Sequence, residues 1–443
     1  MAEDAGTWTR DSIEKWICAT LEWEYAELRV LTGGNSRFVA ITSPGEAGDG
    51  RQWLVRANLR HDPSDPFPLE HEARVYAALA RTDVLAPALC AVSADTAVLM
   101  TAVVPGLTDL RPLPPVRLRA LTRDLLRVLD ELHAVPLEQL AEDGFLLGEP
   151  VPSSMEAAVG AELGRWCAAV RAAMSPPDPL IELGLRWLLD NVPAVASPAV
   201  LVHGDLGPDN FLYEGEAVTG LIDWELAHPG DPLEDLCWLL MRTALADLPE
   251  MTDEVVAQLK ERGAFASERA RHDYQLVLVL WKLLVIRHRA VGDAGRNLGR
   301  DIYYRLQHRR MFVEAMSRAL GVAEPEVSSA EWRTTERSWL FDAAIEQVKE
   351  TALPAIEEDA DRVRLSGLVR VLRYLRAWDG IDDREHKEAG AELLAGQIRA
   401  CDVSVSDAYP GLARRVLAEY ALCSDLLGGM REITLFASEG DAD

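Results

Sequence analysis

Apolar residues at the start of the chain recur first at helical and then at strand spacing. The helical spacing covers residues 9–31, with apolar positions at Ile13, Trp16, Ile17, Leu21 and Leu28. A double glycine then precedes the apolar run 38–41, which is typical of a turn that leads into a strand. The following segment QWLVRA predicts a second strand, and the two strands together predict a hairpin.

The pattern then predicts one more helix and one more strand. Residues 66–80 carry a proline near the start of a helical pattern, and residues 96–106 form an apolar strand that stops at Pro105 and Gly106. The first hundred residues therefore predict a small mixed α/β unit. A proline-rich stretch follows at 109–117 and is a plausible hinge.

The remainder of the chain has mostly helical spacing. Residues 116–133 predict an amphipathic helix, with apolar positions at Leu118, Leu121, Leu125, Leu129 and Leu132. Strand pattern returns only at 199–223, and helices are expected again from about 232 to 320. The tail from about 326 is helical, with one apolar stripe made by Leu365, Leu368, Val369, Leu372 and Leu375.

Polar residues with a distinctive spacing lie inside this second strand region. In HGDLGPDN, residues 203–210, Asp205 and Asn210 are separated by four residues in a loop that follows an apolar strand. Protein kinases use this spacing in their catalytic loop, because the aspartate faces the attacking hydroxyl while the asparagine folds back toward a metal. Asp223 comes thirteen residues after Asn210, at the end of another apolar strand, where kinases place a magnesium-binding aspartate.

The segment 201–239 resembles the aminoglycoside phosphotransferase and choline kinase-like superfamily on the motifs HGDLGPDN, LIDWE and GDPLEDL. The resemblance implies an α+β, protein-kinase-like, two-lobed fold with a mostly helical lower lobe, here followed by an additional helical region. The implied domains are a nucleotide-binding lobe at 1–104, a catalytic lobe at 105–325 and a helical extension at 326–443.

The same resemblance implies ATP and Mg²⁺ as cofactors and a small-molecule hydroxyl as substrate. Asp205 would be the catalytic base or orienting group, and Asn210 and Asp223 would bind Mg²⁺. His203 would support the loop rather than do chemistry. In GDPLEDL, the aspartates Asp231 and Asp235 would have a structural role.

The first strands supply candidates for binding the nucleotide. The turn before the first strand would cover the phosphates with Gly33, Gly34, Asn35 and Ser36. The strand at 96–106 would lie near the adenine edge with Met100, Thr101 and Ala102. An ordinary core strand is equally compatible with Met100.

Arg56 occupies the position at which kinases carry the phosphate-pairing lysine. Its expected partner is Glu72, with Glu70 a poorer candidate. Arginine keeps the charge and adds a fork of donors. A branch of the superfamily that includes kinase domains fused to acyl-CoA dehydrogenases resembles this segment and also carries arginine there.

The acceptor is not specified by these motifs, and two kinds of acceptor remain open. An aminoglycoside or other polycation would need several carboxylates near the cleft. A hydroxyacyl-CoA or another phosphorylated acceptor would suit the arginine-rich segment 287–310, in which Arg296/Arg300 and Arg305/Arg309 have i,i+4 spacing. Pairing of these arginines with acidic residues of the C-terminal tail is the interpretation that the surplus of Asp and Glu favours. A catalytically inactive kinase-like binding protein is a further alternative.

Charge and composition restrict the partners. The chain has 443 residues and a formal net charge of −27, so binding to nucleic acid is not expected. Its six cysteines form no CxxC pair, which favours isolated thiols in a reduced compartment. The longest apolar run, 276–286, is about half of a membrane span, and the first residues do not resemble a signal peptide. We therefore expect a cytoplasmic protein without a membrane partner, and no pattern specifies an oligomeric state.

Overall fold

The computed structural model describes most of the chain. The described residues are 8–31, 38–43, 52–58, 67–142, 144–146, 149–173, 176–263, 266–289, 298–327, 334–357, 359–380, 390–426, 433 and 435.

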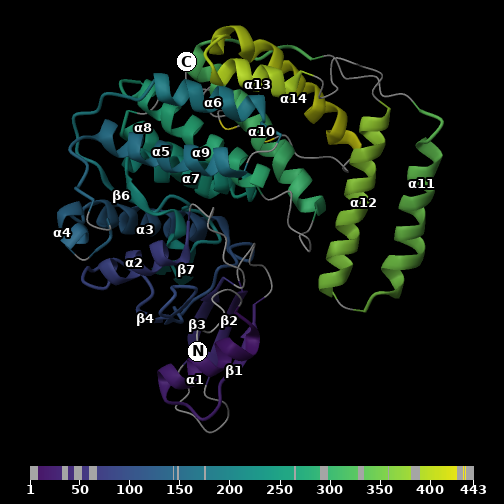
Figure 1. The fold of residues 1–443 in the computed structure, drawn as a ribbon. Coiled ribbons are helices and arrows are strands. Elements are labelled where there is room, and N and C mark those ends of the chain that lie inside the picture. The colour runs from purple at the N-terminus through teal and green to yellow at the C-terminus, as the bar shows by residue number, and fades with distance from the viewer. Residues whose placement is uncertain are drawn as a thin grey trace, which may run out of the picture. The chain divides into compact units, whose positions relative to one another are not determined.

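The N-terminal segment folds into a five-stranded antiparallel sheet with two helices (Figure 1). Its elements are α1 (Arg10–Leu21), β1 (Glu27–Val30), β2 (Phe38–Ser43), β3 (Trp53–Ala57), α2 (Leu69–Leu79), β4 (Leu89–Val92) and β5 (Val98–Ala102). The predicted hairpin is confirmed as β2 and β3, and the strand order is β1-β2-β3-β5-β4.

The helix expected over 9–31 is too long. Helix α1 ends at Leu21 because Glu22 adopts a left-handed conformation, with φ of 56° and ψ of 39°. Leu28 belongs instead to strand β1, where it pairs with Thr42 and is 5% exposed. A buried leucine fits a strand and a helix equally well, so its spacing from Leu21 gave a false extension.

One face of the sheet carries the apolar core of the segment. Ile13 and Ile17 of α1 pack there against Val55 and Met100, all of them fully buried. The register pairs Val55 with Met100 and Arg56 with Leu99, so Arg56 lies on the opposite face. The core therefore fixes which way the candidate phosphate-pairing arginine points.

Helices and two short two-stranded sheets follow the five-stranded sheet. The helices that come before the two short sheets are α3 (Pro115–His133), α4 (Leu137–Glu142), α5 (Met155–Ala173) and α6 (Pro179–Asp190). The strand region comprises β6 (Val200–Val202), β7 (Phe211–Glu214), β8 (Ala217–Leu221), the 3-10 turn η1 (Trp224–Leu226) and β9 (His228–Gly230). Strand β6 pairs with β9 and β7 pairs with β8, each antiparallel. The helices α7 (Pro232–Leu245) and α8 (Pro249–Glu261) come next.

The chain divides into two compact units. Unit 1 comprises residues 1–169 and 194–267, and unit 2 comprises 170–193 and 268–443. Unit 1 contains the five-stranded sheet, the two short sheets and all of the residues proposed above for catalysis and nucleotide binding. The predicted lobe boundaries near residues 104 and 325 stay predictions.

Unit 2 is helical throughout its described part. Its later elements are α9 (Arg269–Arg289), α10 (Leu298–Leu320), α11 (Ser338–Gln347), η3 (Val348–Ala352), η4 (Leu353–Ala355), α12 (Asp359–Asp379), α13 (Ala391–Arg399) and α14 (Val405–Leu426). Gly184 lets α6 approach α9 and α10 closely, because a side chain there would lie 2.7 Å from Trp281 and 2.8 Å from Phe312.

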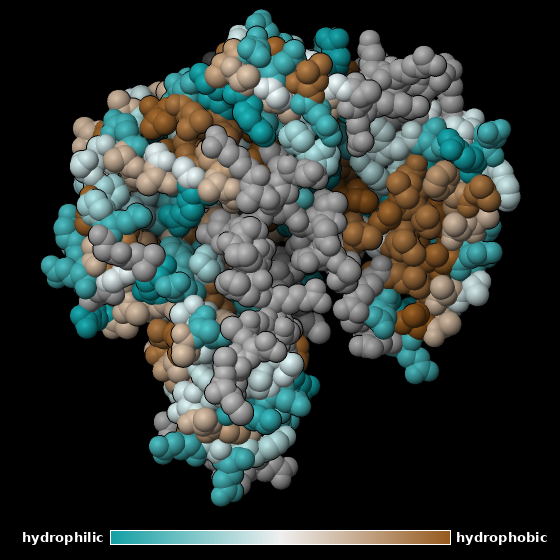
Figure 2. All heavy atoms as spheres, in the orientation of Figure 1, coloured by the Kyte–Doolittle hydropathy of each residue, from teal (hydrophilic) through white to brown (hydrophobic). Residues whose placement is uncertain are grey.

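The helices α11 and α12 expose a set of apolar side chains. Figure 2 shows apolar surface gathered over these two helices. Their exposed large apolar residues are Trp339, Leu340, Val363, Leu368 and Leu375. The predicted apolar stripe of the tail is therefore only partly buried. None of the described helices is long and apolar enough to cross a membrane.

Candidate active site

The loop 203–210 is held at its start by a buried carboxylate from α7. Asp235 is fully buried and accepts hydrogen bonds from the backbone nitrogens of His203 at 3.0 Å and Gly204 at 2.9 Å. The His133 side chain, on α3, approaches the same carboxylate at 2.9 Å. Burial alone would raise the pKa of Asp235, but the contact with His133 and the amide donors keep it below its usual range. These contacts confirm the structural role expected for Asp235.

Two further residues shape the turn. Gly204 has a φ of 78°, and a side chain there would lie 2.4 Å from the carbonyl oxygen of Leu226, so only glycine fits. The buried ring of His203 lies 3.0 Å from the carbonyl oxygen of Ile222 and packs on Trp224. His203 thus supports the loop, as expected.

Asp205 is contacted on each carboxylate oxygen. The guanidinium of Arg242, on α7, donates to Oδ1 at 2.6 Å and to the backbone carbonyl oxygen of Asp205 at 3.1 Å. The side-chain amide of Asn210 donates to Oδ2 at 2.9 Å and to the same carbonyl at 2.7 Å. The structure thus brings Asp205 and Asn210 together, as the spacing predicted, and adds Arg242.

Opposing influences act on the ionisation of Asp205. Burial raises its pKa most strongly, Arg242 lowers it, and the charge of Asp223 raises it again. The net result is a pKa above the ordinary value for an aspartate. A raised pKa is the direction that makes a carboxylate a better proton acceptor.

Arg242 is a functional candidate that the sequence motifs did not identify. It lies in the apolar helix segment LCWLLMRTALA, where a charged side chain needs a buried partner of opposite charge. That requirement was a usable signal, but it does not say which carboxylate is the partner. Gly207 makes room for it, because a side chain at Gly207 would lie 2.3 Å from both Cδ and Nε of Arg242.

Asp223 follows strand β8 and has an uncommon backbone conformation. Its φ is 68° and its ψ is 61°, in the left-handed region of backbone conformation that residues other than glycine seldom adopt. Such a conformation costs roughly 1–3 kcal/mol and is concentrated at functional sites. The backbone nitrogen of Ile222 donates to the carbonyl oxygen of Asn210 at 2.9 Å, which connects the end of this strand to the loop 203–210.

Arg56 links the sheet to this region through three carboxylates. It forms an ion pair with Glu72 of α2, another with Asp223 at 2.9 Å and a longer one with Glu225 at 3.4 Å. Glu72 is fully buried and also accepts from the hydroxyl of Tyr76 at 3.0 Å. Burial by itself would lower the pKa of Arg56, yet the three carboxylates hold it well above its usual value.

The partner of Arg56 is the one that the sequence favoured. Glu72 binds it, whereas Glu70 pairs with the neighbouring Arg74 at 2.7 Å. Glu225 was not foreseen. It lies two residues after Asp223 in LIDWE, and no spacing rule marks it.

The charges of this cluster suit a divalent cation. Glu72, Asp223 and Glu225 pair with Arg56, and Asp205 and Asp209 pair with Arg242, so carboxylates outnumber guanidinium groups in these ion pairs. Among the described residues, no set of three or more His, Cys, Asp and Glu side chains could hold a metal alone. Mg²⁺ commonly takes one or two carboxylates and completes its shell with phosphates and water.

Asn210 and Asp223 fit that role as a pair. Because the amide nitrogen of Asn210 donates to Asp205, its amide oxygen is the atom left to meet a cation. Asp223 supplies the carboxylate, and its side chain is 32% exposed. The donor set is thus hard oxygen, as Mg²⁺ prefers.

The structure describes only three of the other nucleotide-binding candidates, and it places them on both faces of the sheet. Gly33, Gly34, Asn35 and Ser36 lie outside the described residues. The side chain of Met100 belongs to the apolar core on the face opposite Arg56. Thr101 lies on the same face as Arg56, and its buried hydroxyl has no hydrogen-bond partner among the described residues. Ala102 ends β5 beside it.

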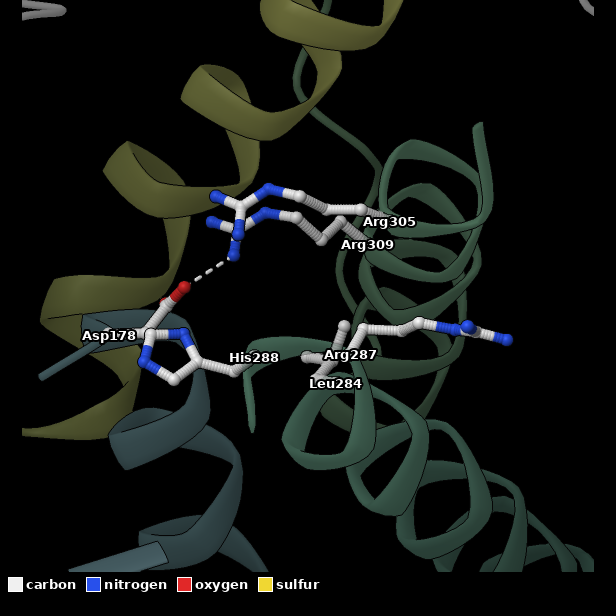
Figure 3. A pocket seen from close by; sticks show the side chains of 6 residues that line it. All are labelled: Asp178, Leu284, Arg287, His288, Arg305 and Arg309. Carbon is white, nitrogen blue, oxygen red and sulfur yellow. Dashed lines mark hydrogen bonds and ion pairs between the residues drawn. The ribbon is translucent and has the colours of Figure 1, made fainter. Parts of the chain in front are cut away.

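The arginine-rich segment 287–310 belongs to unit 2, and its described arginines have various neighbours. Arg287 pairs with Asp301 at 3.4 Å, Arg309 with Asp178 at 2.5 Å, and Arg310 with Glu314 and Glu324. These ion-pair partners all precede residue 326 and so lie outside the C-terminal tail, whereas Glu419 of the tail raises the pKa of Arg309 through its charge. Arg305 and Arg309 extend side by side from α10, in agreement with their predicted spacing (Figure 3). Arg296 lies outside the described residues.

Comparison with known proteins places this geometry in context. The family model described as "Phosphotransferase enzyme family" matches residues 27–273. Among curated proteins, the chain is 29% identical over 197 residues to Acyl-CoA dehydrogenase family member 10 of Mus musculus. It is 26% identical over 135 residues to Acyl-CoA dehydrogenase family member 11 of Homo sapiens. The matches span 41% and 30% of this chain but only 18% and 16% of those proteins.

Solved structures share the fold. A putative aminoglycoside phosphotransferase from Ralstonia eutropha superposes with a TM-score of 0.51 and 19% identity, over 71% of this chain and 99% of that one. A thermostable mutant of an aminoglycoside phosphotransferase, in a ternary complex with AMP-PNP and hygromycin B, gives 0.50 and 17%, over 70% and 100%. The fold is protein-kinase-like, with a small antiparallel sheet and additional C-terminal helices, as the sequence predicted.

The contact between Gly207 and Arg242 makes a prediction about stability. Gly207→Ala should lower the free energy of unfolding by about 1–3 kcal/mol, because the new methyl group overlaps Arg242. In an Arg242→Ala background the same substitution should cost less, since the Cδ and Nε atoms are removed and only Cβ, at 2.8 Å, remains close. Urea denaturation of the four proteins of this cycle measures the coupling.

Gly160→Ala is the matched control. Gly160 lies in α5 with no atom within 4 Å of the added carbon, so alanine there should be neutral or stabilising. An equal cost of Gly207→Ala in both backgrounds would contradict the contact.

Proposed function

Because the chain belongs to the Phosphotransferase enzyme family, we propose that it transfers the γ-phosphoryl group of ATP to a hydroxyl of a small molecule. The observation that carries this proposal is the convergence of Asp205, Asn210, Asp223 and Arg56 in one partly buried cluster. Phosphoryl transfer needs positioning and charge stabilisation more than covalent chemistry, and this cluster offers both.

Each residue has a distinct task in the proposed reaction. Asp205 orients the acceptor hydroxyl and takes its proton, and its raised pKa suits that task. Arg242 and Asn210 each hold one oxygen of that carboxylate, so the direction of the remaining lone pairs is fixed. Arg56, fixed by Glu72, presents positive charge to the phosphates of the nucleotide.

Asn210 and Asp223 would hold Mg²⁺. When bound, the cation supplies positive charge to the β- and γ-phosphate oxygens and neutralises the charge that develops during transfer. The excess of carboxylates over guanidinium groups in the surrounding ion pairs favours a cation. Arg56 pairs with Asp223 here, and this pairing keeps the carboxylate in place for the cation.

The expected location and layout stay part of the proposal. We propose a cytoplasmic protein with a nucleotide-binding lobe at 1–104, a catalytic lobe at 105–325 and a helical extension. All six cysteines are free thiols, which suits a reduced compartment.

A hydroxyacyl-CoA is the second candidate acceptor. The described part of unit 2 contains a recess lined by Arg287, Arg305 and Arg309, and guanidinium groups favour phosphate. The names of the curated relatives, which are acyl-CoA dehydrogenase family members, also favour an acceptor that carries CoA. An aminoglycoside-like polycation would instead need carboxylates at the acceptor pocket. A coupled assay of ADP release with both acceptor classes distinguishes the two.

An inactive kinase-like binding protein is the remaining alternative. Inactive relatives of kinases would be expected to lack the base, a metal ligand or the phosphate-pairing cation. This chain retains Asp205, Asn210, Asp223 and Arg56, and it orients them by hydrogen bonds. The retained set favours an active enzyme.

Replacement of Asp205 tests the proposal most simply. Asp205→Ala should reduce turnover by about 100- to 10,000-fold, because the base is lost, while ATP affinity changes little. The measurements are ADP release over a panel of aminoglycosides, amino alcohols and hydroxyacyl-CoAs, and calorimetric titration of ATP. An Asp205→Ala enzyme that keeps its full rate would overturn the assignment of the base.

The pH dependence of turnover tests the role of Arg242. Asp205 must be ionised to accept a proton, so activity falls as pH drops through its pKa. Arg242 lowers that pKa, whereas burial and Asp223 raise it. Arg242→Gln should therefore shift the acidic limb of the kcat–pH profile to higher pH.

Arg242→Lys is the control, since it keeps the positive charge. Its acidic limb should stay close to that of the wild type. Coincident limbs for the wild type and Arg242→Gln would show that Arg242 does not set the ionisation of Asp205.

A further inference from the structure

Unit 2 contains the small polar recess that was named above in support of a hydroxyacyl-CoA acceptor, and its lining can be examined independently of the proposed reaction. It is lined by Asp178, Leu284, Arg287, His288, Arg305 and Arg309 (Figure 3). The residues come from the start of α6, the end of α9 and the middle of α10. The recess contains about 210 Å³ of space, part of it open to solvent. The enclosed part of the recess is far smaller than a pocket for a whole cofactor, so it suits a compact group.

The single carboxylate among these lining residues is already engaged. Asp178 caps α6 by accepting from the backbone nitrogen of Leu180 at 2.9 Å, and it pairs with Arg309 at 2.5 Å. Burial alone would raise the pKa of Asp178, but Arg309 and Arg305 hold it at about 2. Asp178 is therefore ionised, and its single charge attracts both arginines, although it forms a direct hydrogen bond only with Arg309.

Arg305 is left without a compensating contact. It makes no hydrogen bond or ion pair with any other described residue, whereas Arg309 beside it has Asp178 and Arg287 has Asp301. Glu419 of α14 raises the pKa of Arg309 through its charge, and its carboxylate accepts a hydrogen bond from the hydroxyl of Tyr374 at 3.0 Å. Two guanidinium groups thus extend side by side over one carboxylate.

His288 contributes a ring nitrogen that is free to form a hydrogen bond. One ring nitrogen hydrogen-bonds to the backbone of Pro176, and the other, Nδ1, is buried without a hydrogen-bond partner among the described residues. Burial lowers the pKa of His288, and Arg305 and Arg309 lower it further, although Asp178 opposes them. A neutral ring accepts a hydrogen bond, such as the one that a protonated phosphate oxygen donates.

We propose that this recess is a binding site for a phosphate group, with Arg305 as its principal ligand. Arginine presents donors in a planar fork that matches the oxygens of phosphate, and the pair with Arg309 supplies a second set. The group is either free phosphate or a phosphate monoester carried by an organic ligand. The site lies in unit 2 and needs neither nucleotide nor metal, so it can be tested without the proposed catalytic reaction, even though it would also serve a phosphorylated acceptor.

Calorimetric titration of the full-length protein tests the site. Inorganic phosphate is titrated at constant ionic strength without nucleotide or Mg²⁺, into wild type, Arg305→Gln and Arg300→Gln. Arg300 is exposed on the same helix outside the recess, so its removal changes the net charge equally. We expect Arg305→Gln to weaken binding by about 10- to 100-fold, the usual effect of losing a hydrogen bond to a charged group. Arg300→Gln should change it less than about twofold, since an exposed charge acts weakly at a distance.

Three results would overturn the site. The first is the absence of any phosphate binding by the wild type. The second is an equal loss in both variants, which would mean attraction by net charge alone. The third is binding that Arg305→Gln leaves unchanged, which would mean that phosphate is held elsewhere, such as in the nucleotide site of unit 1.

A second titration assigns the source of the phosphate group. Glycerol 3-phosphate serves as a simple monoester and is titrated into the same three proteins. Binding at least as tight as that of inorganic phosphate, with the same dependence on Arg305, supports a ligand-borne phosphate. Binding of inorganic phosphate alone supports free phosphate. Arg305→Lys keeps the charge but not the fork, and it should bind with intermediate affinity.

Discussion

The active site depends on the pairing of two arginines with carboxylates that would otherwise repel one another. Asp205, Asp223, Glu72 and Glu225 converge near Arg56 and Arg242, partly shielded from solvent. Two like charges about 4 Å apart repel by about 4 kcal/mol at an effective dielectric constant of about 20. The arginines offset that repulsion, and removal of either would leave a buried carboxylate without its partner.

The fold serves this pairing by fixing each arginine on a rigid element. Arg56 lies on a central strand whose opposite face is packed against α1, so its side chain can point only toward Glu72 and Asp223. Arg242 lies on α7, the helix that also carries Asp235. The same helix therefore anchors the start of the catalytic loop and holds its carboxylate. Gly207 completes the arrangement by leaving space for the arginine.

The sequence predicted those residues of the candidate site whose positions depend on short distances along the chain. Asp205, Asn210 and Asp223 could be identified because a loop of fixed length and a strand end determine where they lie. Arg56 and Glu72 followed from the strand and helix pattern. Arg242 could not be assigned a partner, because its contact with Asp205 spans 37 residues and depends on how α7 packs. Helix α1 was overextended for a similar reason, since burial of Leu28 does not reveal its secondary structure.

The two units differ in how far the sequence constrains them. Unit 1 carries motifs in which chemistry and spacing reinforce each other, whereas the later helices of unit 2 carry only apolar periodicity. Side chains on α11 and α12 such as Trp339 remain exposed despite that periodicity, which indicates a helix but not the partner of its apolar face. The arginine pair on α10 is an exception, because its spacing alone placed both charges on one face.

The central claim is that the surplus negative charge around Asp223 is a site for Mg²⁺ together with a nucleotide. The direct test is calorimetric titration of AMP-PNP into the wild type and into Asp223→Ala, each with Mg²⁺ and with EDTA. The account predicts that Mg²⁺ tightens binding to the wild type at least tenfold and that Asp223→Ala loses this enhancement, since one carboxylate ligand is removed. Equal affinity with and without Mg²⁺ in the wild type would contradict it.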